Sequence, residues 1–100
     1  MSVNAQRRKH ERIAVDREVD IEIGGRRLRG RLVDVSDGGA FVRLSIDVAM
    51  GDEVTLALAD EPVRARADVR RVDTEGFAIR FDQETVGRIM REAARNGAKG

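Results

Sequence analysis

A chain of 100 residues is long enough for one domain with a modest core and too short for two ordinary domains. It contains no cysteine, which excludes a disulfide framework, a thiol nucleophile and a thiolate metal site. The net charge is only +1, and the aromatic residues are three phenylalanines, so aliphatic side chains must dominate the core.

The first twelve residues are basic and nearly devoid of large apolar side chains. Residues 1–12 hold four Lys or Arg side chains against one acidic side chain, a composition too polar to fold by itself. We predict a flexible basic arm, suited to hold phosphate, RNA or an anionic membrane surface, although a solvated tail explains the same charges. Because no apolar run is long enough to cross a bilayer, we expect a cytoplasmic protein without membrane insertion.

Alternation of apolar and polar residues predicts strands from here on. In residues 15–23 the apolar side chains share one face and the acidic side chains share the other. The glycine pair at 24–25 predicts a hairpin turn into a second strand that ends near Val35. Within this second strand the apolar positions change parity, and Gly30, just before the change, indicates a bulge or sharp bend.

The later part of the chain continues the pattern and ends in a helix. Four more strands are centred on residues 42–44, 54–58, 63–69 and 77–81. The apolar period then changes to that of a helix, whose predicted buried face holds Val86, Ile89, Met90 and Ala93. Consecutive short strands without helical crossovers favour an antiparallel barrel or sandwich. The predicted organisation is an arm over 1–12, a β-domain over 13–96 with its helix at about 83–96, and a tail over 97–100.

The usual catalytic constellations are missing. His10 is the only histidine and lies in the arm, so a histidine metal site or a catalytic triad would rest on it alone. Ser36 is not part of a G-x-S-x-G elbow, and the chain has neither a Walker A loop nor a dinucleotide fingerprint. We therefore expect no enzymatic activity, no bound metal and no cofactor.

Two short motifs need a separate explanation. Arg8 and Arg12 form an RxxxR pair before the first strand, and the second and third strands are joined by a D-x-S-x-x-G motif made of Asp34, Ser36 and Gly39. RxxxR spacing recurs elsewhere in this arginine-rich chain and carries little information alone. The second motif alone could be a turn closed by side-chain hydrogen bonds.

In their order and context, the two motifs give the chain a resemblance to the PilZ domain family, whose members characteristically bind the bacterial second messenger cyclic di-GMP. The resemblance covers about residues 7–92 and includes GDEVTLAL and GFAIRF as the fourth and last strands. It implies an all-β fold with one C-terminal helix, the six-stranded antiparallel PilZ-type β-barrel. The periodicity independently favours the same architecture.

The resemblance also implies a ligand site. Arg8 and Arg12 would bind cyclic di-GMP, because a guanidinium is a planar fork that fits phosphate oxygens or guanine O6 and N7. Asp34 would accept hydrogen bonds from a guanine edge, and Ser36 would bond the base or a phosphate. Gly39 would let the backbone and the ligand approach closely.

Arg7 stands immediately before the arginine pair and adds a finer hypothesis. A third guanidinium there could stack on a second cyclic di-GMP, so that the ligand binds as a stacked dimer.

Binding would order the arm and present a new surface to an unidentified effector protein. The family's candidates for that effector are machinery of motility, surface polysaccharide synthesis or biofilm control.

Two alternatives remain open. A nucleic-acid-binding module would use the basic arm and a barrel face, but the acidic middle of the chain and the lack of Tyr and Trp argue against it. A PilZ-like adaptor that binds no nucleotide is the other alternative. The intact motif pair argues against it.

Overall fold

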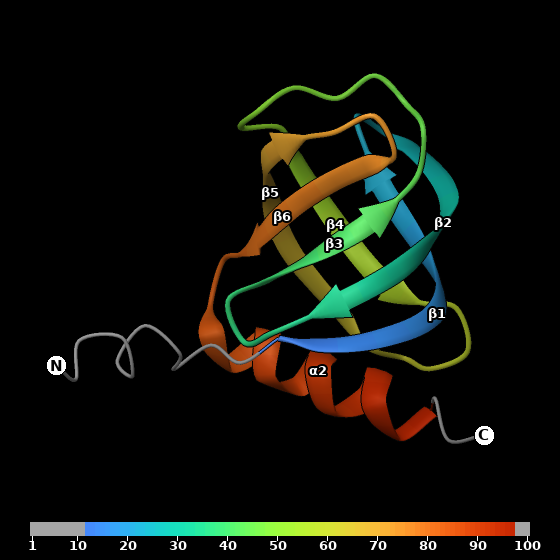
Figure 1. Cartoon of the computed structure of the whole chain (residues 1–100), viewed down its shortest axis with the longest axis vertical. Helices are drawn as coiled ribbons and strands as arrows, with labels where there is room; N and C mark the ends of the chain where they lie inside the picture. Colours follow the sequence, from blue (N-terminus) through green and yellow to red (C-terminus); the bar gives the residue numbers. More distant parts are fainter. Residues whose placement is uncertain (1–11, 98–100) are drawn as a thin grey trace, which may run out of the picture.

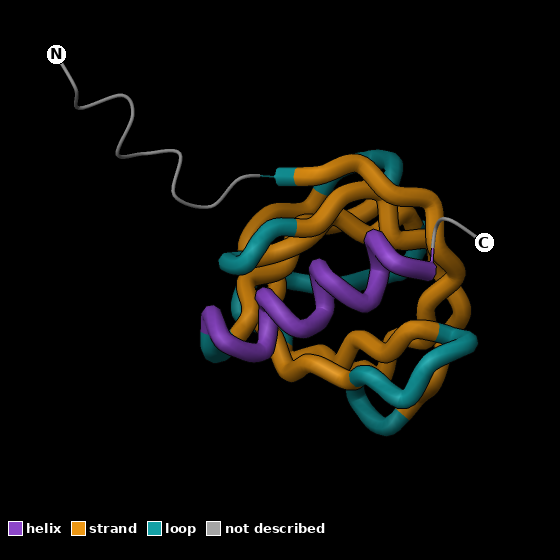
Figure 2. Tube along the Cα trace, turned by 90° about the horizontal axis from the view of Figure 1, so that it is seen from below, coloured by secondary structure: helices purple, strands orange, loops and turns teal. Residues whose placement is uncertain are grey.

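The chain folds into a closed barrel of six antiparallel strands with one helix across an end (Figures 1 and 2). The computed structural model describes residues 12–97. Its elements are β1 (Ile13–Ile23), β2 (Arg26–Val35), β3 (Gly39–Arg43), β4 (Glu53–Leu58), β5 (Arg64–Val72), β6 (Gly76–Phe81) and α2 (Glu84–Gly97). Around the barrel the strands follow the order β1-β2-β3-β6-β5-β4, and β4 pairs with β1. The predicted fold class, a six-stranded antiparallel barrel with one C-terminal helix, is confirmed.

The interior of the barrel is filled by the apolar face of each strand. In β1, Val19 and Ile21 are fully buried, whereas Glu18 is exposed, as expected because successive side chains of a strand point to opposite faces. Burying one such side chain stabilises the fold by about 1.5–3 kcal/mol. The largest fully buried side chains are Phe77, Ile21, Leu32, Leu56, Met90, Val19, Val35, Val42 and Val69.

Helix α2 packs on the barrel with the predicted face except at Ile89, since Val86 and Ala93 also pack against the core. Met90 is fully buried, as is Ala94, but Ile89 is 53% exposed. The prediction for Ile89 was wrong because the helix is rotated so that Gly87 shares the inner face with Met90. A Cβ on Gly87 would overlap the carbonyl oxygen of Asp37, so glycine permits the close approach of α2 to the β2–β3 turn.

Arg17 is a buried charge on the apolar face of β1. Its residue surface is only 6% exposed. The guanidinium donates hydrogen bonds to the carbonyl oxygens of Ala93 and Ala94, at 3.1 and 2.7 Å, and to Asp60 Oδ1 at 2.6 Å. A cation near the last carbonyls of a helix is favourable. Sequence reasoning missed this residue, which joins β1, the β4–β5 loop and the end of α2.

Three of the strand pairs contain an irregularity in their register. The irregularities lie between Ala14 and Arg17 in β1, between Leu32 and Asp34 in β2, and between Val69 and Arg71 in β5. The predicted parity change in β2 is therefore present, but its expected position at Gly30 was wrong. Gly30 keeps a regular register with Val19, and the irregularity comes at Val33.

Part of the predicted organisation lies outside the described residues. Arg7 and Arg8 belong to that part, together with His10, whereas Arg12 is described. Residues 98–100 of the predicted tail are likewise outside it. Within residues 12–97 no helix has the length and apolar character needed to cross a membrane.

Candidate functional site

The turn between β2 and β3 is closed by the hydroxyl of Ser36. Ser36 Oγ accepts hydrogen bonds from the backbone N–H groups of Gly38 and Gly39, both at 3.2 Å, and donates to the Gly39 carbonyl oxygen at 3.3 Å. A serine hydroxyl has one donor and two acceptor positions, so these three bonds use all of them. Because the residue is also only 2% exposed, a direct bond from Ser36 to a ligand has no support in this geometry.

Gly39 follows the turn and lies against the backbone of β6. A Cβ at this position would overlap the carbonyl oxygen of Ile79. In addition, the carbonyl oxygen of Gly38 accepts a hydrogen bond from the Phe81 N–H at 2.9 Å. Glycine is thus required at position 39 because the backbone comes close to β6. The predicted approach of Gly39 to a ligand stays a prediction.

Asp37 fastens the other side of the turn to α2. Its Oδ1 lies 3.1 Å from Arg91 Nε, and both side chains are about four-fifths buried. The N–H does not point at the oxygen, so the contact is an ion pair without a hydrogen bond. Together with the close approach at Gly87, this pair fixes the turn between the barrel and the helix.

Asp34 and Arg12 are brought into contact on the outer face of the barrel. Arg12 Nη1 donates a hydrogen bond to Asp34 Oδ1 at 2.5 Å, although 22 residues separate the two in sequence. From the buried Leu32, regular alternation would point Asp34 into the core, but the irregularity after Leu32 turns it outward. The structure therefore joins the last residue of RxxxR to the first residue of D-x-S-x-x-G.

An open cavity of about 300 Å³ lies at this ion pair. This volume is at the lower end of the range for small-molecule sites. The lining combines guanidinium groups, a carboxylate and an aromatic ring, which suit phosphates, base edges and base faces respectively. The lining residues are Arg12, Asp34, Phe41, Arg71 and Ala78.

Sequence reasoning missed Phe41 and Arg71 as parts of this cavity. Phe41 had a detectable signal, because Val42 and Leu44 alternate as the apolar side of the third predicted strand, and the residue before Val42 then belongs to the opposite face. Arg71 had none, because its orientation depends on the irregularity between Val69 and Arg71 in β5.

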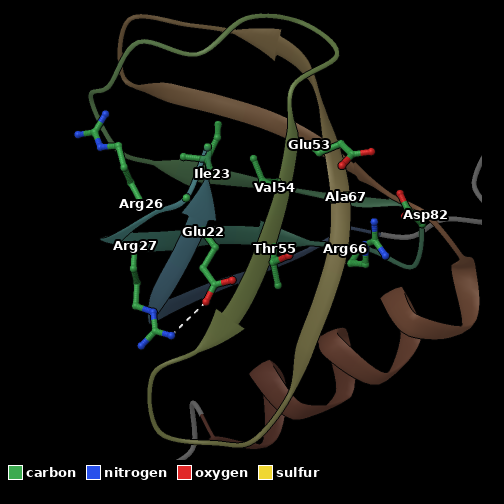
Figure 3. A pocket seen from close by; sticks show the side chains of 12 residues that line it. Glu22, Ile23, Arg26, Arg27, Glu53, Val54, Thr55, Arg66, Ala67 and Asp82 are labelled. Carbon is green, nitrogen blue, oxygen red and sulfur yellow. Dashed lines mark hydrogen bonds and ion pairs between the residues drawn. The ribbon is translucent and has the colours of Figure 1, made fainter.

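A larger cavity of about 630 Å³ lies apart from these residues, beside the β1–β2 hairpin, β4 and β5 (Figure 3). Its Glu22 accepts hydrogen bonds from Arg27 and Arg64, each at 3.1 Å. The hydrogen bond from Arg27, followed by that from Arg64, lowers the pKa of Glu22. Glu53 and Asp82 also line this cavity, so its charges are mixed and favour no single class of ligand.

Within residues 12–97 no group of three or more His, Cys, Asp or Glu side chains is placed to hold a metal ion.

Comparisons with known proteins agree on the fold. The PilZ domain model matches residues 6–94. Among solved structures, the PilZ domain of CeSA from a cellulose-synthesizing bacterium is similar with a TM-score of 0.70 and 19% identity, covering 83% of this chain and 96% of that one. The PilZ domain of YcgR from Escherichia coli with c-di-GMP is similar with a TM-score of 0.66 and 17% identity, covering 94% and 95%.

A third solved structure, an uncharacterized Legionella protein, has a TM-score of 0.59 at 16% identity and covers 89% of this chain and 98% of that one. At these identities the likeness concerns the fold alone. The search of curated proteins finds no match.

Proposed function

This chain belongs to the PilZ domain family, and from that premise we propose that it is a receptor for cyclic di-GMP rather than an enzyme. The contact between Arg12 and Asp34 carries the proposal, because it brings one residue of each predicted motif to the same cavity. Cyclic di-GMP offers two phosphates and two guanines. A guanidinium and a carboxylate side by side can serve both, the first as donor and the second as acceptor.

The ion pair between Arg12 and Asp34 occupies the place that the ligand would take. Its side chains are 55% and 26% exposed, and exposed ion pairs contribute only about 0–1 kcal/mol to stability. A phosphate or a guanine edge can therefore displace it at little cost. Without ligand, the guanidinium of Arg12 and the carboxylate of Asp34 neutralise each other. On binding, the ligand would replace each of them as the other's partner.

The remaining motif residues have two kinds of role in this proposal. Arg8 joins Arg12 in binding phosphate oxygens or a guanine edge, while Asp34 accepts hydrogen bonds from guanine N–H groups. Ser36 is a positioning residue, because its hydroxyl closes the turn that follows Asp34. Gly39 positions the same turn against β6.

Arg7 is proposed to contact a second cyclic di-GMP stacked on the first. Calorimetric titration tests this idea through stoichiometry. Two ligands per chain in the wild type and one in Arg7→Ala are expected. One ligand per chain in both proteins would contradict the stacked dimer.

The signal is proposed to pass through the N-terminal arm in the cytoplasm. Ligand binding draws residues 1–12 onto the barrel face and creates a surface that an effector protein reads. Motility, surface polysaccharide synthesis and biofilm control are the processes that the family resemblance implies. The effector itself stays unassigned.

Equilibrium binding of cyclic di-GMP tests the proposal. The wild type should bind with a dissociation constant of about one micromolar or below. Arg8→Ala, Arg12→Ala and Asp34→Ala should each bind roughly tenfold to a hundredfold more weakly, since a hydrogen bond to a charged group contributes about 1.5–3 kcal/mol. Arg27→Ala is the matched control, because it removes one exposed arginine that pairs with Glu22 at a distant cavity.

Three results would contradict the proposal. The wild type would bind no cyclic di-GMP, or the three variants would bind as well as Arg27→Ala. The third is preferential binding of polynucleotides that weakens steeply with salt, which would indicate a nucleic-acid-binding module instead.

A further inference from the structure

We propose that Arg71 reads the guanine base of the ligand, donating to O6 and N7 of a ring that lies on Phe41. This inference rests on the proposed function and adds to it a residue that belongs to neither motif. It also assigns a class of contact, recognition of a purine edge. Arg71 lines the same cavity as Arg12 and Asp34.

Arg71 ends a continuous row of cross-strand neighbours. Asp34 on β2 is paired with Phe41 on β3, Phe41 is paired with Ala78 on β6, and Ala78 is paired with Arg71 on β5. These four strands are successive neighbours in the barrel, with β3 and β6 side by side in Figure 1. The row therefore crosses one barrel face from a carboxylate to a guanidinium.

Both charged ends of the row point outward because of strand irregularities. Val69 is fully buried, so regular alternation would send Arg71 into the core, but the irregularity between them reverses its direction. The Arg71 side chain is 66% exposed as a result. The same reversal acts on Asp34. Bulges that re-aim side chains are common beside binding sites, and here two of them aim opposite charges at one cavity.

The middle of the row is an apolar floor. Phe41 and Ala78 each lie between two buried neighbours along their strands, so both side chains belong to the outer face. Phe41 is half-buried and offers a ring face for stacking, while the small Ala78 leaves space beside it. Asp34 and Arg71 lie three strand spacings apart. At about 4.8 Å per spacing, their backbones are roughly 14 Å from each other. That gap suits a purine with a hydrogen bond at each edge.

The two ends of the row match the two edges of guanine. Guanine carries N–H donors on its Watson–Crick edge and the acceptors O6 and N7 on its Hoogsteen edge. A carboxylate only accepts and a guanidinium only donates, so Asp34 fits the first edge and Arg71 the second. The ion pair that Arg71 makes with Asp73 spans 3.8 Å between exposed side chains, and a ligand can replace it.

A double-mutant cycle with a modified ligand tests the contact. The ligands are cyclic di-GMP and its analogue with both guanines replaced by 7-deazaguanine, which lacks N7 but keeps the phosphates and the Watson–Crick edge. Arg71→Ala should bind cyclic di-GMP roughly tenfold more weakly than the wild type. The wild type should lose affinity for the analogue, and Arg71→Ala should lose clearly less.

Two further variants complete the test. The first separates the planar shape of the Arg71 guanidinium from its positive charge, and the second is a control. Arg71→Lys keeps the charge without the planar fork and should lose most of the preference for N7. Arg70→Ala is the matched control, because it removes the adjacent exposed arginine, which pairs with Asp68 and does not line the cavity. It should bind as the wild type does.

Each contrary result has a distinct meaning. Wild-type affinity in Arg71→Ala, or equal losses in Arg71→Ala and Arg70→Ala, would overturn the inference while leaving the proposed function intact. An analogue penalty as large in Arg71→Ala as in the wild type would place Arg71 away from N7 and also overturn it. Absence of wild-type binding to cyclic di-GMP would overturn the proposed function itself.

Discussion

Ser36 shows how one buried side chain can hold together the turn that follows Asp34, a residue of the proposed ligand site. Its hydroxyl holds the N–H groups of Gly38 and Gly39, which would otherwise be buried or half-buried without a partner. Asp34 lies two residues before it, at the edge of the same turn. The backbone just after Asp34 is therefore held by the Ser36 hydroxyl, while the irregularity before Asp34 turns its carboxylate outward.

Replacing Ser36 by alanine should destabilise the protein by about 1–3 kcal/mol, since unpaired buried polar groups cost that much. Urea unfolding measures this effect, with Ser45→Ala as the control because Ser45 is exposed in the loop after β3. Affinity for cyclic di-GMP should fall as the turn loosens. A variant of unchanged stability that no longer binds the ligand would show instead that the hydroxyl contacts it directly.

At the scale of elements, the β1–β2 hairpin is held by charges on the outer face of the barrel. Glu22 on β1 accepts hydrogen bonds from Arg27 on β2 and Arg64 on β5. These bonds lower the pKa of Glu22 below the ordinary value of 4.5. The hairpin turn itself needs glycine, because Gly24 and Gly25 have φ angles of 57° and 79°. Turn geometry and paired charges thus support the same register.

The lowered pKa of Glu22 makes part of the stability dependent on pH. A carboxyl with a lower pKa in the folded state adds stability above the unfolded value of about 4.5, and loses it as the pH falls through the folded value. Glu22→Gln should therefore lower the thermal unfolding midpoint slightly near pH 6 and leave it unchanged near pH 3, with a smaller difference at high salt. Glu75→Gln, an exposed carboxyl in the β5–β6 turn, is the control. A difference that persists at about pH 3 would contradict the assignment.

At the scale of the whole molecule, the packing of α2 on the barrel completes the core. Met90→Ala should cost about 2–5 kcal/mol, because it empties a fully buried site. Ile89→Ala should cost less than about 1 kcal/mol, because Ile89 is more than half exposed. Chemical denaturation of both variants measures the two costs. Equal costs would contradict the rotation of the helix described above.

The fold could be predicted from the sequence because strand alternation is a local property. Whether a residue such as Val19 or Leu56 points into the barrel can be inferred from the alternation of apolar and polar residues next to it in sequence. The bulges could not be placed in the same way, since they depend on how many residues oppose one another on two strands. The Gly30 prediction was wrong for this reason, and Arg71 was missed.

The candidate site was predictable only in its local parts. Asp34 and Ser36 could be named because a turn and a motif mark them. The family resemblance implied that Asp34 and Arg12 serve the same ligand, but their direct ion pair was not predicted. The exposure of Ile89 was not predictable, because it depends on a long-range contact between Gly87 and Asp37. The buried position of Arg17 could have been suspected from its parity, but its partners on α2 could not.

The turn held by Ser36 and Asp37 has a thermodynamic consequence for ligand binding. Because the turn is fixed between β6 and α2 by its own contacts, this half of the proposed site should lose little conformational entropy on binding. The conformational cost of the proposed binding then falls mainly on residues outside this turn. If the proposed function holds, substitutions of Arg8 and Arg12 should change the affinity for the ligand while leaving the stability of the barrel nearly unchanged.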